Sequence, residues 1–422
     1  MLGSAGFHKV RSGPATATLR RIFQSLDTRN YRLYFAGDLV SHVGGWMQTM
    51  AEAWLVLTLT NNGAAVGATF AFRFLPVALF GLWGGAIADR FDRRNLLIVT
   101  QMIAALLAIA LWLIVWQGRV AVWMVYALGV SLGFVIVIDE PARHAFVEEM
   151  VGPERVANAV ALTSAVGNSA RITGPALAGL LIGQVGVEWV FFLNGISFLA
   201  VVIALFAMDT RSLHKPLRRA QRPSVREGIR YAWRIHAIRP TIILVAVVGT
   251  LVYNFPTFLS LIAQDTFGGG ASLAGLLMAI LGIGTVIGAL FAAQRKPPTT
   301  RTTIASAAML GTALLIAVSL PGRLPFELML IPVGVLAVFF GSSANAHLQS
   351  HSSQEYRGRV MAIYTSLTLG TTVIGGPFVG WICQTWTPRA GIATAGAVSL
   401  AAATALHLHT RSRHLPATAP VD

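Results

Sequence analysis

The chain has 422 residues, of which 55% are hydrophobic and 12% are charged, and its mean hydropathy is +0.65. Soluble domains carry about 25% charged residues, and ~20 apolar residues cross a bilayer as a helix, so the composition excludes an ordinary soluble protein. It indicates an all-α polytopic membrane protein. The net charge of +15 lies at the ends of apolar runs, which indicates orientation in the lipid bilayer and no nucleic-acid partner.

We predict twelve membrane-spanning helices in two pseudo-symmetric bundles of six. The first six spans cover residues 33–59, 64–88, 95–117, 121–142, 157–183 and 188–208. The second six spans cover residues 240–263, 272–294, 302–320, 326–348, 360–383 and 389–408. The chain is thereby divided into an N-terminal bundle (1–208), a basic linker (209–239) and a C-terminal bundle with its tail (240–422).

The basic residues predict which side of the membrane each loop occupies. Of the 32 Lys and Arg residues, two lie within spans and three lie in the segments assigned to the outside, namely Arg119, Arg323 and Arg389. The remaining 27 lie in the N-terminal segment, the linker, the tail and the loops on their side. Because Lys and Arg mark cytoplasmic loops, we expect both termini and the linker in the cytoplasm of a multi-pass cell-membrane protein.

The two halves of the chain resemble each other. GAIADR at 85–90 matches GALFAAQR at 288–295 in its first and last residues, and GPALAGLLI at 174–182 matches GPFVGWIC at 376–383. The offset is about 202 residues in both cases. A six-plus-six duplication is typical of transporters that hold the substrate between two related bundles near the middle of the membrane.

The loop between spans 2 and 3, GAIADRFDRR at 85–94, resembles the signature loop of the major facilitator superfamily. That signature runs glycine, three residues, acid, base, any residue, glycine and two bases, and Asp92 stands here at the second glycine. The matching residues are Gly85, Asp89, Arg90, Arg93 and Arg94. The resemblance implies that Asp89 contacts the start of span 11 near Val360 and latches the bundles while the cytoplasmic side is closed.

Further stretches are similar to particular branches of that superfamily. ARITGPALAGL in span 5 is similar to the Gly-Pro motif of its antiporters, with Ala170 and Leu180 at the outer glycine positions. GDLVSHVGGWMQ, DEPARHAFVEEMVGPERVANAVAL and REGIRYAW are similar to a bacterial twelve-span exporter branch that contains the enterobactin exporter and macrolide-efflux-like proteins. This similarity implies export by alternating access.

Ionisable side chains within the spans lie in the first half of the chain. They are Asp38, His42 and Glu52 in span 1, Arg73 in span 2, Asp139, Glu140 and Arg143 at the end of span 4, and Arg171 in span 5. A charge at the centre of a spanning helix costs at least ~2.5–3.5 kcal/mol, so such residues are candidates for function. The C-terminal spans contain no Asp, Glu, Lys or Arg in their interiors.

Span 1 carries a polar stripe, because Asp38, His42, Gly45, Thr49 and Glu52 fall within ~80° of one another on a helix. We expect this stripe to face the centre of the protein. Asp38 and Glu52 are candidates for proton coupling, since a carboxyl group in an apolar cavity holds its proton at higher pH. His42 is a candidate proton relay or a polar packing residue.

Fixed ion pairs are the alternative for both acids. Glu52 is placed to pair with Arg73, and Asp38 is placed to pair with Arg143 or Arg171. The estimated depths of the residues allow either pairing, so the sequence leaves proton coupling and a structural ion pair both open.

Three further groups of residues receive interpretations from the sequence. Asp139, Glu140 and Arg143 form either a solvated helix end or a charge cluster at the cytoplasmic gate. Gly174, Pro175 and Gly179, with their counterparts Gly376 and Pro377, predict a bend or a close packing seam between helices. Aromatic and Met side chains are expected to line the substrate cavity: Trp46, Met47, Tyr253, Phe255 and Phe258.

The function predicted is proton-coupled export of a hydrophobic or amphipathic small molecule by a monomer. No nucleotide-binding loop, metal motif, cofactor motif or catalytic motif is present in the sequence, so we expect neither an ATP-driven pump nor an enzyme. Two alternatives remain open. One is uptake or uniport of a metabolite, with Arg73 and Arg171 holding an anion, and the other is a transport-inactive sensor on the same fold.

Overall fold

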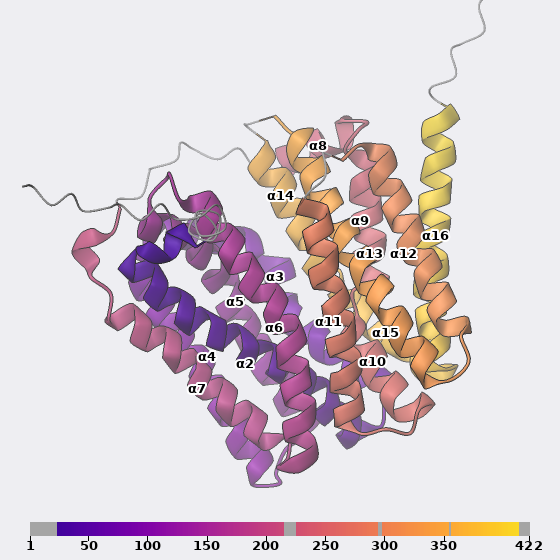
Figure 1. Ribbon diagram of the computed structural model, residues 1–422, viewed down its shortest axis with the longest axis horizontal. Coiled ribbons are helices and arrows are strands. Elements are labelled where there is room, and N and C mark those ends of the chain that lie inside the picture. Colours follow the sequence, from indigo (N-terminus) through magenta and orange to yellow (C-terminus); the bar gives the residue numbers. More distant parts are fainter. Residues whose placement is uncertain (1–22, 215–224, 294–297, 354–355, 413–422) are drawn as a thin grey trace, which may run out of the picture.

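The computed structural model describes residues 23–214, 225–293, 298–353 and 356–412, and this part of the chain is helical throughout (Figure 1). The N-terminal segment 1–22, the middle of the linker and the tail after 412, which the sequence assigns to the cytoplasm, lie outside the described residues.

The N-terminal bundle contains six long helices, preceded by the short helix η1 (Gln24–Asp27). They are α2 (Arg29–Thr60), α3 (Gly63–Arg90), α4 (Arg93–Trp116), α5 (Val122–Val151), α6 (Val156–Gln184) and α7 (Glu188–Phe206). Each corresponds to one of the first six predicted spans. The described parts of the linker contain η2 (Thr210–Ser212) and α8 (Val225–Arg234).

The C-terminal bundle also has six spans, and two of them are interrupted and contain a π-helical turn. The first interrupted span is α9 (Arg239–Leu251), α10 (Phe255–Leu261) and η3 (Ile262–Thr266). The other is α14 (Arg357–Thr365), η4 (Ser366–Gly370) and α15 (Thr372–Thr385). The continuous spans are α11 (Ala271–Ala293), α12 (Thr300–Ser319), α13 (Arg323–Ser350) and α16 (Pro388–Ser412).

Hydropathy separates two helices from the rest. Ten helical segments of the described chain are long and apolar enough to cross a membrane, and α2 and α6 are not among them. Both nevertheless lie inside the N-terminal bundle, where α2 packs against α6 and α7. Polar side chains lower their hydropathy, and these are the helices that carry the polar stripe and Arg171.

One boundary prediction is wrong by a wide margin. The fourth span was expected to end at residue 142, whereas α5 continues to Val151. The charged run that begins at Asp139 resembled a helix end, but Asp139 and Arg143 are buried and paired inside the bundle. Paired charges do not force a helix to stop, so α5 extends about two turns further than expected.

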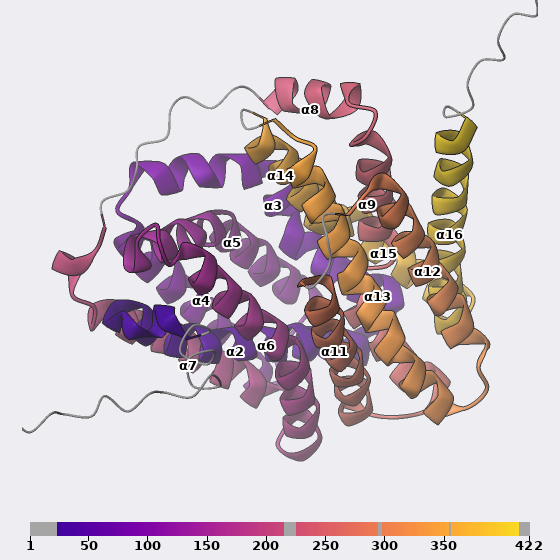
Figure 2. The ribbon, with the colours of Figure 1, turned by 45° about the horizontal axis from the view of Figure 1, so that its top comes forward.

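Equivalent helices of the two bundles make equivalent contacts. In the N-terminal bundle α3 packs on α5 and α4 on α7, and in the C-terminal bundle α11 packs on α13 and α12 on α16. Figure 2 shows α8 lying across one end of the C-terminal bundle, where it contacts α14. We call this end of the molecule the linker side and the opposite end the far side.

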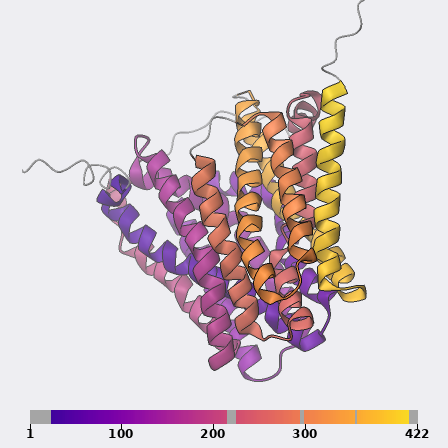
Figure 3. The same ribbon diagram turned by 45° about the vertical axis from the view of Figure 1, so that its right-hand side comes forward.

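The bundles meet through α3 with α15 and α6 with α11. Near the far side the backbones of α3 and α15 touch through glycines, which we call the glycine seam. A Cβ atom at any of these glycines would clash with the backbone of the opposite helix. The glycine seam consists of Gly63, Gly67, Gly376 and Gly380. Figure 3 shows the bundles diverging from here toward the linker side. The far side is therefore the closed end.

Hydrogen bonds between the bundles also lie at the far side. The Gly63 amide donates to Gln384 Oε1 at 2.9 Å, and Gln264 Nε2 donates to Asn61 Oδ1 at 2.7 Å. These bonds satisfy polar groups at the loop between α2 and α3, so they reinforce the closure that the glycine seam allows.

Candidate functional site

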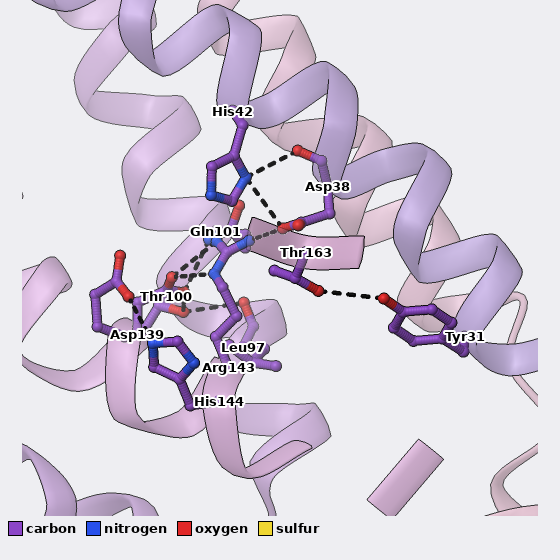
Figure 4. Close-up of polar contacts among 11 residues, drawn as sticks. Tyr31, Asp38, His42, Leu97, Thr100, Gln101, Asp139, Arg143, His144 and Thr163 are labelled. Carbon is purple, nitrogen blue, oxygen red and sulfur yellow. Dashed lines mark hydrogen bonds and ion pairs between the residues drawn. The ribbon is translucent and has the colours of Figure 1, made fainter. Parts of the chain in front are cut away.

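A buried network of charged and polar side chains joins α2, α4 and α5 in the linker-side half of the N-terminal bundle (Figure 4). Arg143 of α5 lies between two acids: it donates to Asp38 Oδ1 on α2 and to Asp139 Oδ2 at 2.8 Å. Thr100 and Gln101 of α4 donate to Asp139 Oδ1 at 2.6 and 2.8 Å. With His42, these residues form what we call the linker-side network.

His42 connects this network to open space. Its Nδ1 atom lies 3.3 Å from Asp38 Oδ1 and 3.0 Å from the Asp38 carbonyl oxygen. The Asp38 side chain is 1% exposed, whereas the His42 side chain is 26% exposed. One turn further along α2, a Cβ atom at Gly45 would meet nothing within 4 Å. The stripe on α2 therefore faces open space at His42 and Gly45, while Asp38 is covered.

The charges of the linker-side network do not cancel. Two carboxylates, Asp38 and Asp139, share one guanidinium, and Asp38 Oδ2 is buried without a hydrogen-bond donor among the described residues. A neutral His42 leaves the network with a net charge of −1, and one added proton makes it neutral. Because uncompensated charge is costly in a low-dielectric interior, this arrangement favours binding of one proton at Asp38 or His42.

Tyr34 of α2 and Glu140 of α5 complete the surroundings. Tyr34 is buried against Phe146, and its hydroxyl lies within electrostatic range of Asp38, Asp139 and Arg143. Glu140 instead points outward, where its exposed carboxylate lies 3.6 Å from His144. The expected cluster of Asp139, Glu140 and Arg143 is therefore divided, and Glu140 is not part of the buried network.

A second ion pair lies nearer the far side. Glu52 Oε1 accepts from Arg73 Nη2 at 3.1 Å and from Gln48 Nε2 at 2.6 Å, and both charged side chains are buried. Asn194 of α7 donates to Gln48 Oε1, and Arg73 Nη1 donates to Thr49 at 3.3 Å. We call Glu52 and Arg73 the far-side pair. Its two charges cancel without a proton.

Sequence reasoning missed the amides of this second site. Gln48 lies on α2 beside the acids of the polar stripe, and Asn194 lies on α7, in a span without a candidate residue; neither was named as a candidate. A signal was present, because Gln48 stands one turn before Glu52 and Asn194 is a polar residue in an otherwise apolar span.

Arg171 has different surroundings from the other two arginines. Its guanidinium lies over the ring of Trp46 at 5.2 Å, and the hydroxyls of Tyr253 and Tyr364 from the C-terminal bundle are within electrostatic range. The pairing with Asp38 that the sequence left open is not formed, because Asp38 pairs with Arg143.

The expected cavity residues divide into two groups. Trp46, Tyr253 and Phe255 are half-buried; Trp46 lies beside Arg171, and Tyr253 is within electrostatic range of it. Met47 and Phe258 are buried. Met47 packs where α6 crosses α2, and Phe258 packs on α16, so in this conformation both are packing residues and not cavity residues.

The loop between α3 and α4 is held to its own bundle. Arg93 lies 2.6 Å from Glu149 and 3.4 Å from Asp89, and Arg94 Nε donates to the Leu205 carbonyl at 2.8 Å. Asp92 accepts from the Asn95 amide at 2.8 Å and caps α4, which explains an acid where the signature has a glycine.

Of the remaining loop residues, Gly85 is half-buried and Arg90 is exposed. Val360, the expected partner region of Asp89, packs with Ala232 and Ile238 of the linker. The latch between Asp89 and the start of α14 stays a prediction for a conformation with the linker side closed.

The glycine-proline motif serves close helix packing. Gly174 lies against α2, where a Cβ atom would approach the Val43 carbonyl at 2.9 Å, and Gly179 lies against α11 at the Ala271 carbonyl, also at 2.9 Å. Pro175 and Pro377 lie inside α6 and α15. The motif therefore contacts both bundles, and its counterpart Gly376 belongs to the glycine seam.

Comparison with known proteins places the chain among transporters. A family model of transmembrane secretion effectors matches residues 21–420. The multidrug efflux pump Tap of Mycobacterium tuberculosis is 26% identical over 367 residues, which cover 81% of this chain and 84% of that pump. The enterobactin exporter EntS of Escherichia coli is 23% identical over 374 residues, covering 87% of this chain and 88% of that exporter.

The staphyloferrin A transporter of Staphylococcus aureus is 23% identical over 266 residues, which cover 61% of this chain and 66% of that transporter, just under two thirds of its length. Among solved structures, a bacterial homologue of the human lysosomal transporter Spinster superposes with a TM-score of 0.72 at 14% identity. That match covers 93% of this chain and 98% of the other, and it shows the fold.

Proposed function

The chain belongs to the transmembrane secretion effector family of the major facilitator superfamily, and we propose that it exports small molecules in exchange for protons. Membership makes the protein a transporter and not an enzyme, and it confirms the resemblance carried by residues 85–94. Tap and EntS are named for drug efflux and enterobactin export. By analogy we propose a hydrophobic or amphipathic substrate, such as a drug, an antibiotic or a siderophore-like compound.

The charge of the linker-side network is the observation that carries the proton-coupling proposal. Two buried acids share Arg143, so the network is neutral only with one additional proton. One carboxylate oxygen of Asp38 has no hydrogen-bond donor in the described part of the chain and can receive that proton, and His42 stands between Asp38 and open space. In this proposal His42 relays the proton and Asp38 holds it, while Asp139 is fully hydrogen-bonded and keeps Arg143 in place.

Alternating access then couples the proton to the substrate. With the far side open, the network takes a proton from outside, and with the linker side open it releases that proton to the cytoplasm. The substrate travels in the opposite direction between the bundles. The positive charge of the linker supports a cytoplasmic linker side with both termini in the cytoplasm, and we propose that the monomer is the transporting unit.

Reconstituted liposomes provide the test. With a pH gradient imposed, a panel of amphipathic drugs, dyes and siderophores is screened for uphill movement by the native protein. The variant Asp38→Asn should lose gradient-driven accumulation and retain downhill exchange, because it can no longer release the proton. Movement of every compound at a rate independent of the gradient would contradict coupling and favour a uniporter, whereas movement of no compound would favour a sensor.

A further inference from the structure

Three arginines lie in the interiors of the described spanning helices, and Arg171 is the one of them that pairs with no carboxylate of the described residues. Arg73 has Glu52, and Arg143 has Asp38 and Asp139. The Arg171 guanidinium lies over the Trp46 ring at 5.2 Å, and Tyr253 and Tyr364 of the other bundle are within electrostatic range. A guanidinium keeps its charge, so at this depth in a spanning helix an anion would stabilise it, and the described residues do not supply one.

The position of Arg171 gives a ligand access to it. Arg171 lies near the middle of α6, and its carbonyl is beside Gly282 of α11 at the interface between the bundles. Arg171 is exposed, and it lies between Trp46 of its own bundle and the two tyrosines of the other bundle that are within electrostatic range. Beside it on α2, the space at Gly45 is open. The guanidinium therefore faces the open space between the bundles and not lipid.

Two hydroxyl groups from the C-terminal bundle complete the surroundings. The Tyr253 hydroxyl donates to the Ala337 carbonyl at 3.0 Å, and the Tyr364 hydroxyl donates to the Gly341 carbonyl at 3.1 Å. A Cβ atom at Gly341 would lie 3.1 Å from the Tyr253 hydroxyl, so the glycine keeps room between the two rings. These α13 carbonyls fix the tyrosines at a place within electrostatic range of Arg171.

We propose that Arg171 binds a carboxylate group of the transported molecule, which makes carboxylate-bearing amphipathic compounds the preferred substrates. The planar guanidinium can hold a carboxylate with two parallel hydrogen bonds, and Trp46 keeps its plane oriented. Tyr253 and Tyr364 border the same space from the other bundle, so the bound group contacts both halves that move during transport. This inference rests on the proposed function, since it assigns the substrate class of the exporter.

Equilibrium binding of two matched probes tests the assignment without requiring transport. Naphthalene-2-carboxylate and naphthalene-2-methanol share one ring system and differ in charge, and their dissociation constants are measured on the purified full-length protein. We expect the carboxylate to bind about tenfold tighter or more, as a charge-assisted hydrogen-bonded pair does. Arg171→Gln should remove this preference, and Arg171→Lys should retain part of it.

Control variants make the result decisive. Arg323→Gln removes an exposed arginine outside the site and should leave the preference unchanged. Thermal unfolding of Arg171→Gln and Arg171→Lys shows whether each variant is folded, and the lysine variant carries the test if the glutamine variant is not. A native protein that binds the carboxylate no better than the alcohol, including one that binds neither, overturns the assignment. So does a preference that survives in Arg171→Gln.

The variant Asp38→Asn separates this inference from proton coupling. We expect it to lose gradient-driven accumulation and to keep the full carboxylate preference, because Asp38 pairs with Arg143 and not with Arg171. Proton coupling fails alone if the gradient has no effect while the carboxylate preference persists. The substrate assignment fails alone if the gradient drives transport while the two probes bind equally.

Discussion

The two ends of α2 hold acids in contrasting ways. At the linker side, Asp38 and Asp139 share one arginine, and His42 borders open space. At the far side, Glu52 has Arg73 to itself, and the bundles close nearby through the glycine seam. Asp38 and Glu52 each have one buried carboxylate oxygen without a hydrogen-bond donor among the described residues, so hydrogen bonding alone does not distinguish them. The difference lies in charge and access, and it teaches that a buried ion pair is a candidate for coupling only where its charges fail to cancel.

The largest contrast is expected in transport. Asp38→Asn should reduce gradient-driven accumulation to the level of simple equilibration, whereas Glu52→Gln should keep coupling because the far-side pair binds no proton in the cycle. The measurement is accumulation in liposomes for both variants under the same pH gradient. Coupling lost in Glu52→Gln and kept in Asp38→Asn would reverse the assignment of the two sites.

Replacing either Arg143 or Arg73 should destabilise the folded protein. Arg143→Gln leaves two buried acids without a cation, and Arg73→Gln leaves one, so each is expected to lower the free energy of unfolding by about 3–5 kcal/mol. Low pH should restore stability more in Arg143→Gln than in Arg73→Gln. In the first variant two unpaired carboxylates, Asp38 and Asp139, take up protons, whereas in the second only Glu52 does. Unfolding in detergent across a pH series checks this, and equal pH dependence of the two variants would contradict the charge count.

The glycine seam is expected to show a moderate effect. Gly67→Ala places a methyl group against the carbonyl of Gly376 and should slow transport several-fold by holding the far side apart. Gly81→Ala on the same helix is the matched control, since its Cβ atom would make only an ordinary contact at 3.7 Å. Labelling of a cysteine introduced at Asn61 reports opening of the far side. Equal labelling of both variants would show that the seam does not control closure.

The smallest effect is expected at the linker-side loop. Asp92→Ala removes the cap of α4 and should cost about 1 kcal/mol of stability without altering transport. Asp89→Asn should do the opposite: it should leave insertion and stability intact and slow transport, if Asp89 latches the bundles when the linker side closes. Flux and unfolding are measured on both variants, and unaltered transport in Asp89→Asn would reduce the loop to a signal for orientation.

Much of the fold could be predicted from the sequence, since the length of each apolar run fixes a spanning helix. The predicted spans each match one helix or one interrupted helix of the structure. The π-helical turns η3 and η4 could not be predicted, because they change the hydrogen-bond register and not the hydropathy. The end of α5 was missed because charge alone cannot distinguish a solvated helix end from a buried pair.

The residues of the site could be predicted from the sequence, but which acid pairs with which arginine could not. Helical spacing placed Asp38, His42 and Glu52 on one stripe, and both observed ion pairs were among the alternatives that their depths allowed. Depth could not decide whether Asp38 meets Arg143 or Arg171, because that choice depends on the neighbour toward which each helix is rotated. Arg143 and Asp139 lie one turn apart on α5, so helical spacing alone brings them together. The hydrogen bonds from Thr100 and Gln101 to Asp139 instead require the packing of α5 against α4, which spacing within one helix does not give.

The glycine seam has a consequence for how such a protein can diversify. Its contacts are made by main-chain atoms, and every substitution at its four positions adds atoms where none fit. Selection therefore has little to adjust in the seal itself. Around Arg171, the side chains of Trp46, Tyr253 and Tyr364 border open space, so fewer packing contacts constrain substitutions there. A lineage can thus change what it carries while the barrier against leakage stays the same.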